Sequence, residues 1–340
     1  MWRCALITAA LCIAALPAFA GPVLLQTYGA AVQVSNGGAV PSVAQLEIVL
    51  RPGDFVRDIL GWQKADPHCD LQHTSSPKIT IPSETAVLYK NVAAAQGRNF
   101  VTLAFNNVHC GQPTNSGSGT FPTTPALRAE FAAYAVGVVN QVPALGGISI
   151  WNELNGTWNG HLGSEAQTLT QYCLLANAVI IAVRQVDKKI PITIGASQGW
   201  NIDGWFNDMF DKYGCIGKGD PTIWLDVHPY LSGAKARHTH KTDWQLWQQK
   251  ISNIREDGIT NPLMATEWGA QAAYQWLIKH PKGDYPGTFK SQVLEQDPNW
   301  AGATWFEMLY DKRFPNAGLF DSNSSLTEPG ANYINDFRDN

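Results

Sequence analysis

From about residue 30 the chain alternates short apolar or β-branched runs with longer helical patterns. This alternation is typical of parallel β/α architecture, in which each strand is followed by a helix that covers the sheet. Eight such units predict an α/β fold of a single domain, the (β/α)8 or TIM barrel. We expect strands near 30–34, 55–59, 100–106, 147–152, 191–195, 223–227, 262–266 and 301–306. We expect helices near 43–50, 84–96, 125–141, 164–186, 201–213, 242–256, 286–296 and 331–338.

The first twenty residues have the pattern of a secretory signal peptide. Arg3 precedes an apolar stretch from Ala5 to Leu16, and the segment ends in Pro17-Ala18-Phe19-Ala20. We therefore expect residues 1–20 to be removed, leaving a barrel domain over 21–340 that is secreted or periplasmic. The apolar stretch is too short to predict a membrane span, so no membrane contact is expected after cleavage.

Composition narrows the range of partners. The net charge of −4 and the pI near 6.0 argue against a nucleic-acid partner, because phosphate binding needs a basic face. No C-x-x-C motif is present, so neither a zinc nor a redox site is predicted, and no cofactor or metal is expected. No coiled coil or apolar helix face indicates an oligomeric state.

Four cysteines remain after residue 20, and export would permit disulfides between them. The expected strands place Cys69 and Cys110 in successive loops on one face, and Cys173 and Cys215 on neighbouring helices. This favours the pairs 69–110 and 173–215, while buried free thiols remain the alternative.

Two carboxylates end predicted strands that lie opposite each other across the barrel. Glu153 follows the run 147–150 on the fourth strand, and Glu267 follows the run 262–266 on the seventh. Active sites of such barrels lie at the C-terminal ends of the strands. Hydrolysis of a glycosidic bond needs two carboxyl groups, one to protonate the leaving oxygen and one to act as nucleophile or base. We expect the pair to lie roughly 5–5.5 Å apart, the spacing of enzymes that retain configuration.

The motifs Trp151-Asn152-Glu153-Leu154-Asn155 and Thr266-Glu267-Trp268-Gly269 resemble the signature pair of the clan A glycoside hydrolases, which include families 5 and 39. The resemblance implies that Glu153 is the acid/base, that Glu267 is the nucleophile, and that Asn152 binds the sugar 2-hydroxyl. The clan usually has proline after the acid/base, where this chain has Leu154. Elsewhere the resemblance extends along the chain only as the order of elements.

Further residues follow from the same resemblance. Tyr230 and His228, after the sixth strand, would contact Glu267 and the acid/base or site wall. Arg57, on the second strand, would hold Glu267 ionised, with a surface pair to Asp58 as the alternative. Trp305, on the eighth strand, would stack under the sugar, and Glu307 is the rival carboxylate. The other expected substrate contacts are Asn106, Asn107 and His109 after the third strand, and the loop tryptophans Trp62, Trp158, Trp200 and Trp268.

These residues predict a secreted retaining β-glycosidase that acts on a polysaccharide. Family 39 and its relatives acting on bacterial exopolysaccharides resemble the chain most, and a family 5 endoglucanase or mannanase is the alternative. A barrel that binds polysaccharide without cleaving it is a second alternative, and a metal-dependent hydrolase is a third, disfavoured because the sequence shows no ligand cluster. His238-Thr239-His240 has a metal-like spacing but lies among Lys235, Arg237 and Lys241, which favours a solvated loop.

Overall fold

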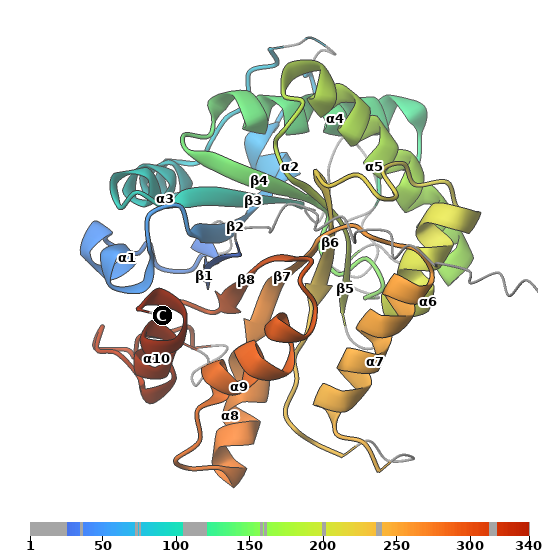
Figure 1. The fold of residues 1–340 in the computed structure, drawn as a ribbon. Coiled ribbons are helices and arrows are strands. Elements are labelled where there is room, and N and C mark those ends of the chain that lie inside the picture. Colours follow the sequence, from blue (N-terminus) through green and yellow to red (C-terminus); the bar gives the residue numbers. More distant parts are fainter. Residues whose placement is uncertain are drawn as a thin grey trace, which may run out of the picture.

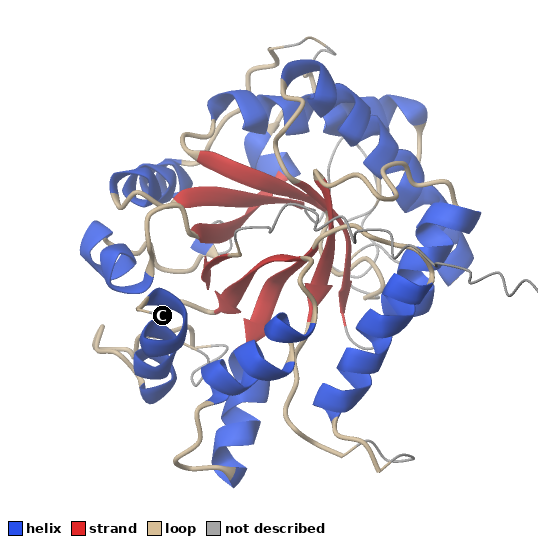
Figure 2. Cartoon of the chain, viewed as in Figure 1, coloured by secondary structure: helices blue, strands red, loops and turns tan. Residues whose placement is uncertain are grey.

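The computed structural model describes residues 26–34, 37–71, 74, 76–104, 121–156, 159, 162–198, 202–235, 240–312 and 318–339. Within this part of the chain, eight parallel strands close into a barrel in the order β1 to β8, with β8 pairing back onto β1. Figure 2 shows the strands as a central ring with helices around it. The predicted (β/α)8 barrel is confirmed.

The strands and helices have the following bounds, and Figure 1 labels most of them. The strands are β1 Thr27–Ala31, β2 Phe55–Gly61, β3 Arg98–Ala104, β4 Leu145–Ile150, β5 Ile192–Gln198, β6 Ile223–His228, β7 Leu263–Gly269 and β8 Trp300–Phe306. The helices are α1 Val43–Val49, α2 Trp62–Ala65, α3 Ser83–Ala94, α4 Pro125–Gln141, α5 Glu165–Val186, α6 Ile202–Asn207, α7 Asp243–Glu256, α8 Ala270–Lys279, α9 Tyr285–Gln292 and α10 Glu328–Tyr333. Short π or 3-10 turns, Asp208–Lys212, Leu294–Gln296 and Ile334–Arg338, follow α6, α9 and α10.

The prediction was wrong about the first strand by three residues. β1 runs from Thr27 to Ala31 and contains Gly29, which lies outside the expected strand 30–34. A Cβ at Gly29 would lie 1.7 Å from the Phe55 carbonyl oxygen, so only glycine permits this approach of β1 to β2. The α8 helix was missed, because the only helix expected between the seventh and eighth strands was 286–296.

An apolar layer fills the barrel at the N-terminal ends of its strands. Phe55, Phe100, Trp224 and Met264 form one buried cluster with Ala301. The rings of Phe100 and Trp224 stack with centroids 6.5 Å apart. This apolar layer closes the barrel at the N-terminal ends of the strands, so a polar active site can form only at their C-terminal ends.

The longest helix, α5, is long and apolar enough by composition to cross a membrane, but half of its most apolar window is buried in the protein. Its Tyr172 donates a hydrogen bond of 3.0 Å to the Ile150 carbonyl of β4. A disulfide joins its Cys173 to Cys215, as predicted. These contacts identify α5 as part of the helical layer around the barrel. Cys110 lies outside the described residues, so the 69–110 pair stays a prediction.

Candidate active site

The nucleophile candidate, Glu267, is buried and bound on both carboxylate oxygens. Arg57 Nη1 donates to Oε1, and the Tyr230 hydroxyl donates to Oε2. Burial alone would raise the pKa of Glu267, but Arg57, His228 and Tyr230 together outweigh it and hold the pKa below its usual range. Glu267 is therefore ionised near neutral pH, as attack on carbon requires.

Arg57 has no exposed surface and binds three partners at once. Besides Glu267, its Nη2 donates to Asn152 Oδ1 at 2.7 Å and its Nε donates to Thr102 Oγ1 at 2.8 Å. The surface pair with Asp58 considered from the sequence is wrong, because both side chains are fully buried. A guanidinium group only donates, so the Asn152 amide oxygen faces Arg57 and its NH2 group is left for another acceptor.

Glu153 is brought inward by a turn of the backbone directly after β4. Trp151 and Glu153 both have positive φ angles, 69° and 44°, a backbone conformation that residues other than glycine rarely adopt. Trp151 stacks on Phe121 with centroids 4.5 Å apart and donates to the Asn159 carbonyl at 2.6 Å, away from the barrel axis. Asn152 and Glu153 then lie at the barrel mouth.

Leu154 stands where the clan A enzymes usually have proline, and its backbone makes a hydrogen bond that proline could not make. The backbone N–H of Leu154 donates to the Ala196 carbonyl at 3.2 Å, and the Leu154 side chain is fully buried. Proline has no N–H and could not make this bond. The leucine therefore ties the Glu153 loop to β5.

His228 joins the two carboxylates. Its Nδ1 lies 3.0 Å from Glu153 Oε1 and 3.7 Å from Glu267 Oε2. Burial alone would lower the pKa of His228, but the charges of Glu267, Glu153 and Asp226 and the hydrogen bond to Glu153 raise it above the usual value. One oxygen of each glutamate and a ring nitrogen of His228 all lie within 4.8 Å of one another.

The hydrogen bonds made by Asp226 and Thr266 determine which ring nitrogen of His228 carries a hydrogen. Asp226 accepts hydroxyl hydrogen bonds from Ser149, Thr193 and Thr266. Since Thr266 spends its only hydrogen on Asp226, its oxygen must accept from His228 Nε2, 3.0 Å away. His228 Nε2 is thus the donor to Thr266, and the other ring nitrogen, Nδ1, faces Glu153 Oε1.

No protein-family model matches this chain, and no curated protein matches it. Solved structures do. A family 39 glycoside hydrolase from the gut symbiont Bacteroides cellulosilyticus WH2 matches with a TM-score of 0.64 and 16% identity over 92% of this chain and 64% of that one. A GH5 enzyme from Streptomyces cattleya, solved with Manβ1-4GlcNAc, matches at 0.63 and 16% over 92% and 80%. An endo-β-1,4-glucanase from Xanthomonas axonopodis pv. citri matches at 0.58 and 15% over 93% and 100%.

The chain has the fold of these glycoside hydrolases. At such low identity the likeness concerns the fold alone. The chain spans less than two thirds of the length of the family 39 enzyme.

Within this glycoside hydrolase fold, two predicted sugar contacts lie away from the barrel mouth. Trp305 and Trp268 are buried, with ring centroids 4.8 Å apart, and Trp268 stacks on Phe289 of α9 at 4.0 Å. Both rings belong to the layer between strands and helices, so the prediction that they touch substrate is wrong. Trp62 is likewise buried, against Phe131 of α4.

The error for Trp268 arises because β7 continues past the expected end at residue 266 and contains a bulge. Ala265 pairs with Ala303 and Trp268 pairs with Trp305, so β7 has one residue more than β8 between these pairs. The extra residue lets Thr266 and Glu267, although adjacent, both reach the polar network in the barrel, and it turns Trp268 outward.

Sequence reasoning missed Phe306, which alternates with Trp305 and clusters with Ala31 and Tyr230 at the mouth. It also gave no role to Ser149, Thr193, Thr266 and Asp226. Strand alternation with His228 could have indicated Asp226, because residues two apart share a face. Asn106, Asn107, His109, Trp158 and Trp200 lie outside the described residues, so their predicted roles stay predictions.

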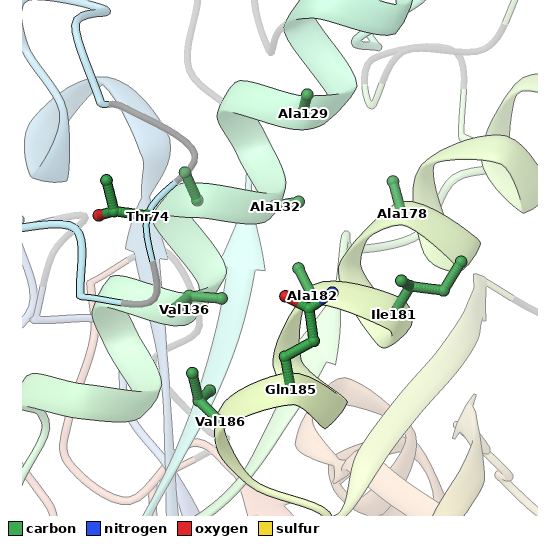
Figure 3. Close-up of a pocket in the computed structure, with 10 residues that line it drawn as sticks. Thr74, Ala129, Ala132, Val136, Ala178, Ile181, Ala182, Gln185 and Val186 are labelled. Carbon is green, nitrogen blue, oxygen red and sulfur yellow. The ribbon is translucent and has the colours of Figure 1, made fainter.

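Two hollows lined by described residues bear on the location of the site. One, of about 230 Å³, lies between α4 and α5 on the outside of the barrel, and Figure 3 shows Val136, Ala178, Ile181 and Gln185 around it. No carboxylate lines it, so it is not the hydrolytic site. The other, of about 450 Å³, opens beside Tyr230 at the barrel mouth.

Proposed function

We propose that the chain is a retaining glycoside hydrolase that cleaves β-glycosidic bonds in a polysaccharide by double displacement. The observation that carries the proposal is the pairing of an ionised Glu267 with Glu153 beside His228, with one oxygen of each glutamate within 4.8 Å of the other. Inverting enzymes need about 6.5–9.5 Å between the two groups, to leave room for water. The fold of family 39 and GH5 enzymes supports the same proposal.

Each side chain has a definite part in this mechanism. Glu267 Oε2 or Oε1 attacks the anomeric carbon while Glu153 gives its proton to the leaving oxygen, and a glycosyl-enzyme ester forms. Glu153 then takes a proton from water, which attacks the same carbon and releases Glu267. The NH2 group of Asn152, oriented by Arg57, donates to the sugar 2-hydroxyl. The ring of Phe306 offers an apolar surface to the sugar.

Polysaccharide hydrolysis tests the function directly. We expect release of reducing sugars from at least one polymer among β-glucans, mannan, xylan and bacterial exopolysaccharides. If none of these polymers releases reducing sugars but at least one is bound, the alternative of a barrel that binds polysaccharide without cleaving it would be favoured. The comparison enzymes include a mannosidase, a glucanase and a xylosidase, so they do not identify the sugar that this chain would cleave. The choice between a family 39-like and a family 5-like substrate therefore belongs to this panel.

Secretion is part of the proposal. The signal-peptide pattern of residues 1–20 and the disulfide between Cys173 and Cys215 both suit an oxidising compartment. Fractionation of cells that express the full chain would find it in the periplasm or medium, with Gly21 at its N-terminus.

Replacing the acid/base separates the two chemical steps. In Glu153→Ala, we expect turnover of polysaccharide to fall about 10²–10⁴-fold, because no acid protonates the leaving oxygen. An aryl glycoside with a good leaving group needs no acid and should react at once with Glu267. Added azide should then restore turnover and give a β-glycosyl azide, seen by NMR. An α-glycosyl azide would mean that the mechanism inverts.

A metal-dependent hydrolase is the second candidate, and the structure corrects the sequence reading that no ligand cluster exists. Glu153, His228 and Glu267 could together hold a cation by spacing alone. Arg57 argues against it, because its guanidinium already binds Glu267 and would repel a second positive charge. We expect prolonged dialysis against a chelator to leave kcat unchanged. A loss of activity that a divalent metal reverses would favour the metal mechanism.

A further inference from the structure

A buried carboxylate, Asp226, lies inside the barrel between the apolar layer and the candidate catalytic residues. Trp224, Asp226 and His228 are alternate residues of β6, so their side chains share its inner face, and Trp224 belongs to the apolar layer. Hydroxyl groups from three other strands donate to the Asp226 carboxylate. We call Asp226 and these donors the polar layer, and the donors are Ser149 of β4, Thr193 of β5 and Thr266 of β7.

The polar layer occupies a position that barrels of this kind usually fill with branched apolar side chains. All four of its side chains are fully buried. Burying a carboxylate costs free energy even where hydrogen bonds satisfy it, and apolar residues of similar volume are often no less stable. Stability therefore gives no reason for a charge here. A buried network whose members are all bonded does fix the direction of each hydrogen bond.

Thr266 connects the polar layer to His228. Of the three described hydroxyl groups, that of Thr266 also lies beside the imidazole, with Oγ1 3.0 Å from His228 Nε2. Its hydrogen is donated to Asp226, so its oxygen accepts from Nε2. The direct distance from Nε2 to Asp226 Oδ1 is 3.9 Å, too long for a hydrogen bond. Asp226 therefore acts on His228 through Thr266.

We propose that Asp226 and Thr266 are positioning residues for the acid/base, which act through His228. Their hydrogen bonds fix the imidazole ring at Nε2, and this directs Nδ1 at Glu153 Oε1, 3.0 Å away. Without the Thr266 hydroxyl the ring can turn about its Cβ–Cγ bond, and Glu153 loses its fixed partner. The proposal rests on the proposed glycosidase function and adds to it two residues that would not touch the substrate.

The nucleophile candidate is held independently of this chain of hydrogen bonds. Arg57 and the Tyr230 hydroxyl each bind one oxygen of Glu267. Loss of the Thr266 hydroxyl should therefore impair protonation of the leaving oxygen more than attack on the anomeric carbon. Phenyl glycosides have a poor leaving group and need the acid, whereas dinitrophenyl glycosides have a good leaving group and do not.

Thr266→Val replaces the hydroxyl group by a methyl group of similar size. We expect kcat/KM on the phenyl β-glycosides of glucose, mannose and xylose to fall about ten-fold, because a buried hydrogen bond to the imidazole is lost. On the corresponding dinitrophenyl glycosides the fall should be no more than about two-fold, since that reaction does not need the acid. Thr266→Ser keeps the hydroxyl group and should restore most of the activity lost on the phenyl glycosides.

Thr193→Val is the matched control. It makes the same exchange on a neighbouring strand and removes another donor to Asp226, at 3.2 Å, but one that does not lie between Asp226 and His228. Any loss in Thr193→Val should be the same on both kinds of glycoside. If Thr266→Val also lost the same factor on both kinds, the polar layer would act only through packing. That result would overturn the inference and leave the glycosidase proposal standing.

NMR of the full protein with isotope-labelled histidine tests the hydrogen-bond direction without any substrate. The signals of His228 would be assigned by their absence in His228→Gln. We expect a hydrogen on Nε2, protected from exchange with water in the wild type and in Thr266→Ser, and exchanging in Thr266→Val. A hydrogen on Nδ1 alone would overturn the inference. If no glycoside is cut but Nε2 behaves as expected, the glycosidase proposal fails and the fixing of His228 by Thr266 stands.

Discussion

The Glu267→Ala variant is expected to lose about 10⁴-fold or more in kcat on every glycoside, with the protein still folded. The reason is that the ionised Glu267 carboxylate attacks the anomeric carbon in the proposed mechanism, whereas Glu153 serves the leaving group. The variant loses stability, because the buried Arg57 is left without its counter-charge, but it should remain folded, because Arg57 keeps its hydrogen bonds to Asn152 and Thr102. Reducing-sugar assays and circular dichroism on the same preparation would test both statements.

Glu307 provides the matched comparison for this variant. It is a second buried carboxylate, directly after β8, and the sequence left it as a rival for the catalytic role. Glu307→Gln should keep activity within a few fold of the wild type. If Glu307→Gln were inactive and Glu267→Ala active, the nucleophile would have been assigned to the wrong strand. Trapping the ester with a fluorinated glycoside and locating it by mass spectrometry would identify the residue independently.

The part of the site that the sequence could predict depends on short-range patterns. Glu153 and Glu267 each come directly after an apolar run, and the C-terminal ends of barrel strands meet at one face. That rule brought the two carboxylates together, and the resemblance to the clan A glycoside hydrolases added Arg57, His228 and Tyr230. The structure places all five within one network of contacts.

The part that failed depends on backbone irregularities that no short pattern reveals. β7 continues to Gly269 through a bulge between Ala265 and Trp268, so Trp268 lies on the strand, facing the helices, and not in the loop where it was expected. Trp305 was chosen for its residue type, yet its neighbour Phe306 has the inward position. The positive φ values at Trp151 and Glu153 likewise end β4 at Ile150, two residues before the end of the expected strand 147–152. In each case tertiary contacts determined the direction of the side chain.

Arg57→Met is expected to cause the largest loss of stability of any single change at the site. The variant leaves the buried Glu267 carboxylate without its cation, and breaking a buried ion pair in this way costs about 3–5 kcal/mol of unfolding free energy. Urea denaturation at pH 7 would measure the loss. Lys212→Met is the control, because its pair with Asp208 is exposed and should contribute little.

The pH dependence of this loss identifies its cause. In the wild type the folded-state pKa of Glu267 lies below its ordinary value of 4.5, so its contribution to stability is present above about pH 4.5 and is lost as pH falls through the lower folded pKa. In Arg57→Met burial dominates and raises that pKa, so the carboxyl instead becomes destabilising as pH rises above 4.5. The difference in stability between the two proteins should therefore widen from pH 4 to pH 7.

The rise in the pKa of Glu267 in Arg57→Met should also change the pH dependence of kcat/KM. Glu267 acts only when ionised, so the acid limb of the kcat/KM profile should move to higher pH in Arg57→Met. Arg57→Lys should restore part of the stability and of the acid limb, since one ammonium group can pair with Glu267 but cannot also bind Asn152 and Thr102. A constant stability difference across pH 4–7, with an unmoved acid limb, would show that Arg57 supports the barrel by packing and not by charge. Tyr230 and His228 would then be the groups that keep the nucleophile ionised.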